Sequence, residues 1–264
     1  GAKEADLAII RQTYGLDRPL VVQYFDWLAR MLAGDFGQSL YFRTSVTKLI
    51  ADKLPTTFLI GSLSLLLALA LAIPLGVVSA VNAGSWIDRL ALAVAVAGQA
   101  LPNFFFALCL IMVFSISLRW LPVSGSDTWA HFVMPTIALG YYVTPPIMRL
   151  VRAGMIEVLS SDYIRTARAK GLGEGGVLFL HALKNAAVPI VTVIGIGVAL
   201  LIGGAVVTES VFAIPGLGRL TIDAIVRRDY PLIQGIVLMF SFVYVLVNLV
   251  VDLIYTLLDP RIRY

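Results

Sequence analysis

The residues best suited to bind a partner lie together in one polar stretch, residues 157–189, with the sequence EVLSSDYIRTARAKGLGEGGVLFLHALKNAAVP. Residues 160–162 are two serines and an aspartate, whose short side chains accept hydrogen bonds from the free backbone N–H groups at the start of a helix. Residues 163–170 contain neither glycine nor proline. Gly171 follows, and glycine readily takes the left-handed conformation in which many helices end. The stretch therefore predicts a short cationic helix that stops at a glycine.

A second helical segment, residues 177–187, is predicted between the glycine pair at 175–176 and Pro189. Arg165 and Arg168 lie three residues apart on one face of the first helix. Long apolar runs flank the whole stretch, so a basic loop here belongs on the cytoplasmic side of a membrane. Two helices and a glycine joint suit a loop that binds something there. The plainer alternative is a solvated loop whose cations only fix the topology.

Catalytic, metal and nucleotide chemistry have no visible residues to support them. The single cysteine, Cys109, lies in an apolar run, and His131 and His181 have no other cysteine or histidine near them. No glycine-rich loop ends in Lys-Ser or Lys-Thr, so we expect no ATP site of that kind. The net charge of +4 comes from cations in connections between apolar runs, which does not fit a nucleic-acid-binding face. We therefore expect no enzyme activity, no metal and no nucleic-acid partner.

Apolar runs of membrane-spanning length dominate the rest of the chain. The sequence is 59% hydrophobic with a mean hydropathy of +0.90, and a soluble domain rarely exceeds half apolar. About 20 apolar residues cross a bilayer core, and no alternating strand pattern is present. We predict an all-α membrane bundle over residues 56–264, with the cytoplasmic loop at 152–187. The predicted spans are residues 57–81, 90–118, 132–150, 188–208 and 232–258.

Lysines and arginines in the short connections predict the orientation, because cytoplasmic loops carry an excess of them. The side predicted to be cytoplasmic holds Arg89, the basic loop with Arg149 at its flank, Arg261 and Arg263, and the other side holds Arg119, Arg219, Arg227 and Arg228. Residues 1–55 are too charged to span and are predicted to form an extracytoplasmic segment with short helices. Because such a segment is not easily exported ahead of the first span, we expect a preceding span outside this sequence and six spans in total.

Several motifs resemble those of the inner-membrane permease subunits of binding-protein-dependent ABC importers, in the dipeptide, oligopeptide and nickel branch. In order they are YGLDRP at 14–19, GDFGQS at 34–39, DYIRTARAKGL at 162–172, HALKNAAVP at 181–189, PGLGR at 215–219, RRDYP at 227–231 and DPRIR at 259–263. The resemblance covers essentially the whole chain, and the motifs occur in the order and spacing of the family.

The general cytoplasmic signature of this family reads Glu-Ala-Ala, a glycine four positions later, and then Ile-x-Leu-Pro. The chain departs from it in a way that resembles the peptide branch. Gly171 and Leu183 are kept, whereas Arg165, Thr166 and Ala167 fill the first three places, His181 stands for isoleucine and Lys184 stands for proline. A role for the signature glutamate therefore does not carry over to this chain.

The resemblance implies a permease of the bacterial or archaeal cytoplasmic membrane. The implied partners are a second homologous permease, two ATPase subunits or domains that bind ATP and Mg²⁺, an extracytoplasmic solute-binding protein and the lipid bilayer. The ATPase dimer closes on ATP, and its surface groove would receive the short helix in the helix-in-groove manner. The residues expected at this contact are Asp162, Tyr163, Arg165, Thr166, Ala167, Arg168, Lys170, Gly171 and Leu172.

Candidate pathway residues are neutral or small. Gln99 and Asn103 could line the pathway or hydrogen-bond between helices, and Tyr141 could contact solute or simply pack. Gly203 and Gly204 could line a pore or allow close helix packing, including packing against the second permease. The outer-side candidates are Pro215, Gly216, Gly218, Arg219 and Asp229. They could dock the binding protein, cap an outer gate, or form a turn in which Asp229 pairs with Arg219.

The expected solute is a short peptide or peptide-like molecule, imported, with a nickel chelate as the alternative. The predicted spans hold no cluster of histidine, cysteine or carboxylate side chains that could ligate bare nickel. A different class, the ion-coupled secondary transporter, normally carries ionisable side chains deep within its spans. The centres of the first four predicted spans contain none, which disfavours that class.

Overall fold

The structure, a computed structural model, describes residues 17–177 and 183–258 and consists of helices and their connections. Within these residues the one β-type pairing is an isolated bridge between Gln38 and Ser45. Continuous apolar runs without alternation favour helices, in which every interior backbone group finds a partner in the same segment. The prediction of an all-α fold is confirmed.

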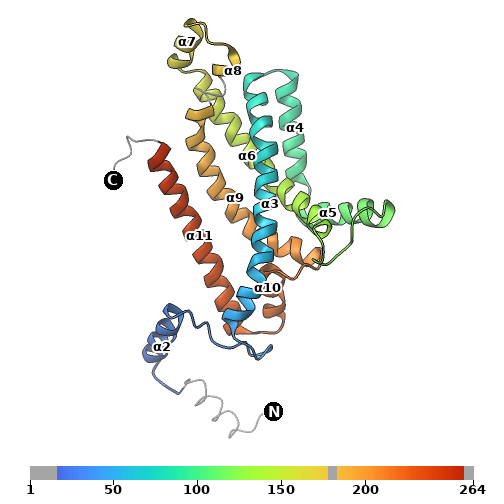
Figure 1. Cartoon of the computed structure of the whole chain (residues 1–264), viewed down its shortest axis with the longest axis vertical. Helices are drawn as coiled ribbons and strands as arrows, with labels where there is room; N and C mark the ends of the chain where they lie inside the picture. The colour runs from blue at the N-terminus through green and yellow to red at the C-terminus, as the bar shows by residue number, and fades with distance from the viewer. Residues whose placement is uncertain (1–16, 178–182, 259–264) are drawn as a thin grey trace.

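Long helices form the body of the molecule (Figure 1). The elements are α2 Leu20–Leu32, α3 Val46–Val81, α4 Trp86–Ala100, α5 Asn103–Leu110, the π-helix η1 Ile111–Ser117, α6 Ala130–Leu159, α7 Asp162–Ala169, α8 Glu174–Gly176, α9 Leu183–Val211, α10 Leu217–Val226 and α11 Tyr230–Leu258. Helix α6 packs against α3 and α9, and α9 packs against α11. Helices α3, α6 and α11 run from the α10 end of the bundle to the α7 end, and α9 runs back.

Helix α3 is longer than the apolar run that predicts it. It begins at Val46 and continues through Pro55 and Pro74, so the predicted boundary at residue 55 falls inside one helix. Val46 and Ile50 are buried in a small core with residues of α10 and α11, among them Leu217. Burial of this first face stabilises the helix enough to accommodate a proline, which removes one backbone hydrogen bond.

The predicted span at residues 90–118 is divided in two. Helix α4 ends at Ala100, Leu101 is extended with φ −88° and ψ 123°, and Pro102 is the N-cap residue of α5. A residue before proline is pushed away from the helical region by the proline ring. The break therefore has a local cause, and it turns α5 and η1 away from the axis of α4 (Figure 1).

Helices α3 and α6 approach closely at two glycines. A Cβ at Gly76 would lie 2.8 Å from Cβ of Val151, and one at Gly140 would lie 3.0 Å from the carbonyl oxygen of Ser64. Small residues at such crossings let two backbones pack tightly. Helix α6 also extends to Leu159, so residues 152–159, expected at the start of the cytoplasmic loop, are part of a long helix.

Two of the described helices are long and apolar enough to cross a membrane by length and composition. They are Val46–Val81 and the segment Tyr230–Ile254 of α11, each with a mean hydropathy of 2.4 over its most apolar window. Shorter apolar helical stretches are Asn103–Ser117 and Gly197–Val211. The predicted span at 188–208 falls within α9, which includes Pro189 without a break.

Candidate functional site

Helix α7 lies at one end of the bundle with one face packed into the main hydrophobic core (Figure 1). Ile164 has no exposed surface, Ala167 is buried, and both belong to the same cluster as Met155 of α6. The other face is open, because Tyr163 is 43% exposed and the side chain of Arg165 is 76% exposed. The helix is anchored to α6 and presents an aromatic and cationic surface. The other predicted contact residues are also exposed: Asp162, Thr166, Arg168, Lys170, Gly171 and Leu172.

The C-terminal end of α7 depends on a glycine. Gly171 has φ +79°. Its N–H donates to the carbonyl oxygen of Arg168 at 2.9 Å, and the N–H of Leu172 donates to that of Ala167 at 3.4 Å. These two bonds form a Schellman motif, in which glycine takes the left-handed position at lowest cost. The prediction that the helix ends at Gly171 is confirmed.

The N-terminal end of α7 differs from the prediction. Ser161 occupies the N-cap position but makes no side-chain capping bond. Its hydroxyl donates to the carbonyl oxygen of Val158 at 2.5 Å, and the hydroxyl of Ser160 donates to that of Glu157 at 2.7 Å. The predicted capping role of the serine side chains is wrong, because the last carbonyls of α6 lack helical partners and take these donors instead.

The predicted second helix at residues 177–187 is only partly described. Residues 178–182, with His181, lie outside the described part of the chain. From Leu183 onward the segment belongs to α9, so Pro189 does not end a helix there. That boundary prediction is wrong: the apolar run after Pro189 continues the same helix, as α3 continues through Pro55 and Pro74.

At the opposite end of the bundle, a buried carboxylate caps α10. Glu209 of α9 has no exposed surface. Its carboxylate accepts from the Thr57 hydroxyl at 2.6 Å and from the Arg219 N–H at 3.1 Å, and Thr57 in turn accepts from the Leu217 N–H at 2.7 Å. The first N–H groups of a helix lack internal partners, and negative charge is favoured there. Side chains from α9 and α3 therefore supply the cap that Gly216, the N-cap residue, cannot.

The glycines of the PGLGR motif make room for this cap. A Cβ at Gly218 would lie 2.5 Å from Cα of Val206 and 3.0 Å from a carboxylate oxygen of Glu209. A Cβ at Gly216 would collide with the Glu209 carboxyl group. Pro215, next to Gly216, is half-buried. These glycines are needed for close packing around a buried carboxyl group.

Asp229 holds the N-terminal segment against the turn between α10 and α11. Its side chain is fully buried and accepts from the Ser39 hydroxyl, from the N–H of Leu40 at 3.2 Å and from the N–H of Tyr41 at 3.2 Å. It also accepts from the N–H of Leu232 at 3.4 Å, near the start of α11. One carboxylate thus joins two segments that are 190 residues apart in the sequence.

The predicted pairing of Asp229 with Arg219 is wrong. A guanidinium nitrogen of Arg219 donates to the carbonyl oxygen of Ala213 at 2.7 Å. The oxygens of Asp229 already accept from the N-terminal segment. The guanidinium of Arg227 instead lies 3.7 Å from the ring centroid of Tyr41, a cation–π contact that reinforces the same attachment.

The pathway candidates divide into inward- and outward-facing residues. Asn103 of α5 donates to the Thr208 hydroxyl of α9 at 3.1 Å, while Gln99 is exposed. The ring of Tyr141 packs on Phe106 with centroids 4.4 Å apart, as its packing alternative predicts. The two glycines differ as well. A Cβ at Gly204 would lie 2.5 Å from Leu139, whereas one at Gly203 would meet no atom of the described chain within 4 Å.

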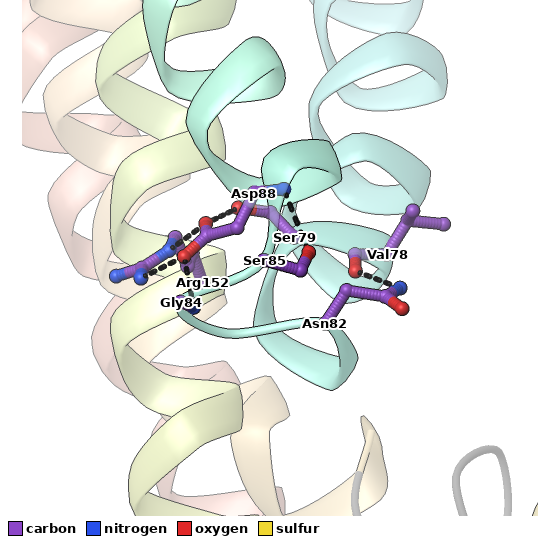
Figure 2. A network of polar contacts seen from close by, with 7 residues as sticks. All are labelled: Val78, Ser79, Asn82, Gly84, Ser85, Asp88 and Arg152. Atoms are coloured by element: carbon purple, nitrogen blue, oxygen red, sulfur yellow. Dashed lines mark hydrogen bonds and ion pairs between the residues drawn. The ribbon is translucent and has the colours of Figure 1, made fainter.

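A third polar cluster lies where the turn between α3 and α4 meets α6 (Figure 2), at the same end of the bundle as α7 (Figure 1). Asp88 is 3% exposed. Arg152 of α6 donates to its two carboxylate oxygens from Nε and Nη2, each at 2.7 Å, and the Ser79 hydroxyl and Gly84 N–H donate at 2.5 and 2.8 Å. The Arg152 guanidinium, followed by the Ser79 hydroxyl and the Gly84 N–H, holds the pKa of Asp88 well below its usual range. The same ion pair raises the pKa of Arg152.

Sequence reasoning missed Glu209, Asp88 and the partner role of Arg152. One local signal was available for Asp88, because Ser85-Trp86-Ile87-Asp88 matches the capping-box pattern before an apolar run. The Ser85 hydroxyl does accept from the N–H of Asp88 at 3.3 Å. No local signal marks Glu209 or Arg152, whose partners come from distant parts of the chain.

The chain resembles known proteins in both sequence and fold. A family model described as "Binding-protein-dependent transport system inner membrane component" matches residues 72–264. The chain is 43% identical over 265 residues to the glutathione transport system permease protein GsiC of Pectobacterium atrosepticum, covering 99% of the chain and 87% of that protein. GsiC of Escherichia coli K12 is 42% identical over 264 residues, covering 99% and 86%.

Solved structures share the fold at lower sequence identity. An inward-facing structure of the MetNI methionine ABC transporter matches with a TM-score of 0.69 and 17% identity, covering 80% of this chain and 96% of that chain. An amino acid ABC transporter crystallised with histidines matches with a TM-score of 0.57 and 17% identity, covering 79% and 93%. At this identity the matches describe the fold alone.

Proposed function

The chain belongs to the family of inner-membrane components of binding-protein-dependent transport systems, and from this premise we propose that it forms part of the import pathway for short peptides or peptide-like solutes such as glutathione. The chain is a permease subunit of an ABC importer and not an enzyme. The observation that carries the solute class is the 43% identity, over 99% of the chain, to a permease named for glutathione transport.

Helix α7 is the proposed contact with the ATPase, which binds ATP and Mg²⁺ in its own subunits. An eight-residue helix with two buried side chains and an exposed opposite face can seat in a groove while staying attached to α6. Its open surface combines Tyr163 with the cations Arg165 and Lys170. Motion of the ATPase would move α7 and, through the shared core, α6.

We propose a multi-pass arrangement with the α7 end in the cytoplasm and the α10 end outside. Long helices α3, α6, α9 and α11 connect the two ends (Figure 1), and α4 with α5 and η1 forms a broken fifth crossing. The attachment of residues 39–41 to Asp229 keeps the N-terminal segment at the α10 end. This end would meet the solute-binding protein.

The second permease is proposed to pack on the face formed by α9 and α11. An open groove of about 320 Å³ lies between these helices, lined by Ala199, Ile202, Phe240, Ser241, Tyr244 and Val245. Gly203 is exposed one turn after Ala199 on the same stripe of α9. A small residue on an open apolar face permits the close helix approach expected between two permeases.

Neutral polar groups are proposed to line the pathway. The Oδ1 atom of Asn103 is buried and has no hydrogen-bond partner among the described residues, while its amide nitrogen is held by Thr208. Gln99, next to the last residue of α4, is exposed. Amide groups donate and accept hydrogen bonds without a fixed charge, which suits solutes with varied side chains.

A nickel chelate remains the second candidate solute. Among residues 17–177 and 183–258, no group of three or more histidine, cysteine, aspartate or glutamate side chains is placed to hold a metal ion. Bare nickel would need such a site, whereas a chelated ion would be recognised through its chelator.

Uptake by the reconstituted complex tests the proposed function. The permease pair, ATPase and binding protein would be placed in proteoliposomes and supplied with ATP and labelled glutathione, dipeptides, pentapeptides or ⁶³Ni with and without a chelator. We expect ATP-dependent accumulation of at least one peptide-like solute. Accumulation of chelated nickel without any peptide uptake would reverse the ranking of the two solutes.

A further inference from the structure

The ion pair between Asp88 and Arg152 has a position and a construction that point to a mechanical role. The charge pattern of the sequence explains Arg152 only as one more cation of a cytoplasmic loop. In the structure its guanidinium makes a two-bond fork to one carboxylate at 2.7 Å per bond, and its side chain is only 24% exposed. A planar fork of this kind fixes both distance and orientation between the groups it joins.

The place where the α3–α4 turn meets α6 is called the junction. Asp88 makes hydrogen bonds to every element that meets there. Its carboxylate accepts hydrogen bonds from Ser79 in the last turns of α3, from Gly84 in the turn and from Arg152 of α6, while Asp88 itself lies in the first turn of α4 (Figure 2). The carboxylate is therefore shared by three helices and the connection between two of them. Gly84 has φ +80°, so the shape of the turn also depends on a glycine.

The ion pair between Asp88 and Arg152 lies near the end of α6 that leads into α7. Arg152 precedes the end of α6 at Leu159 by seven residues, which is about two helical turns. Val151, next to it, contacts α3 at Gly76, where a Cβ would lie 2.8 Å away. Met155 then links this crossing to Ile164 of α7 within one continuous hydrophobic cluster.

We propose that Asp88 and Arg152 are positioning residues that join the α3–α4 turn to α6, so that a displacement of α7 moves α3, α4 and α6 as one rigid body. This inference rests on the proposed coupling role of α7. Apolar contacts alone allow helices to slide past each other, because dispersion attraction is non-directional. A buried fork resists sliding, since any shift breaks directed hydrogen bonds and leaves a buried charge without its partner.

The test separates a mechanical role from a purely structural one by measuring solute imported per ATP hydrolysed. Arg152→Met alone leaves the Asp88 carboxylate buried without a cation and is expected to impair assembly. The double variant Asp88→Asn, Arg152→Met removes both charges together, and such paired replacements are often tolerated. Arg149→Met is the matched control, because Arg149 is an exposed arginine one turn earlier on α6.

For the double variant we expect an assembled complex that hydrolyses ATP but imports about tenfold less solute per ATP, within the usual range of coupling between sites. Arg149→Met should keep the wild-type ratio. A double variant with the wild-type ratio would overturn the inference. If the double variant does not assemble, Arg152→Lys is the deciding variant, because lysine keeps the positive charge but cannot make the two-bond fork to Asp88. A lowered amount of solute imported per ATP would support the mechanical role. An unchanged amount would refute it.

A parallel measurement on Gly171→Val keeps this inference distinct from the proposed function. If Gly171→Val uncouples import and the Asp88–Arg152 variants do not, the junction has no mechanical role and the coupling function of α7 stands. If Gly171→Val leaves the ratio unchanged, the coupling role of α7 itself fails and the inference falls with it.

Discussion

At the scale of single residues, the glycines show why one residue type serves different purposes in one chain. Gly218 is constrained by space, because a Cβ would lie 2.5 Å from the backbone of Val206. Gly171 is constrained by its backbone, with φ +79° and no atom of the described chain within 4 Å of an added Cβ. Gly203 is constrained by neither. We therefore expect replacement by a larger residue to have a different effect at each of these three positions.

Gly218→Ala is expected to destabilise the protein by about 1–3 kcal/mol, the usual cost of overpacking a filled site. The added methyl must displace backbone atoms of α9 or the Glu209 cap. Thermal unfolding of the purified complex should show a lower apparent Tm. Gly61→Ala in α3 is the control and should leave the Tm unchanged or slightly higher, because an added Cβ there meets no atom of the described chain within 4 Å and alanine favours helix over glycine. Equal losses in the two variants would contradict the packing argument.

At the scale of elements, sequence reasoning succeeded where the cause was local. Residues 163–170 and Gly171 predicted α7 and its end, because helix propensity and the glycine stop act within a few residues. Sequence reasoning failed for the side chains that cap helix ends and join distant segments. The Thr57 hydroxyl that reaches Glu209 is 152 residues away, and Ser39 is 190 residues from Asp229. Such partners depend on tertiary packing, which periodicity does not encode.

The segment at residues 39–41 should loosen when Asp229 is replaced by asparagine. Asparagine keeps one acceptor oxygen but loses the charge that strengthens three hydrogen bonds to this segment. Hydrogen–deuterium exchange should be faster at the amides of Leu40 and Tyr41. Asp223→Asn removes an equal charge from α10 and should leave these two amides at the wild-type rate. Unchanged exchange in Asp229→Asn would show that other contacts hold the segment.

The two faces of α7 should differ in their access to the ATPase subunit. Single cysteines would replace Tyr163, which is 43% exposed, and Ile164, which is fully buried, in a chain whose Cys109 is changed to serine. A short thiol cross-linker should join position 163 to cysteines at the rim of the ATPase groove and should not join position 164. Cross-links of similar yield at both positions would mean that α7 does not dock with its open face.

At the scale of the whole molecule, the two ends of the bundle differ in how their segments are held together. The α10 end is fastened by buried carboxylates, Glu209 and Asp229, that receive backbone N–H groups from neighbouring segments. The α7 end combines an exposed helix with one internal ion pair. This difference suits the proposed arrangement, in which the α10 end lies outside, α7 contacts the ATPase in the cytoplasm, and the permease alternates between two states.

ATP-driven uptake by Gly171→Val and Gly173→Val complexes is the most direct test of this coupling. Valine at 171 must adopt the left-handed conformation, which a β-branched residue strongly resists, whereas Gly173 has no positive φ and open space around an added Cβ. We predict that Gly171→Val assembles and hydrolyses ATP but loses most solute uptake per ATP, while Gly173→Val transports like the wild type. Wild-type uptake per ATP in Gly171→Val would contradict the claim that α7 transmits the motion of the ATPase.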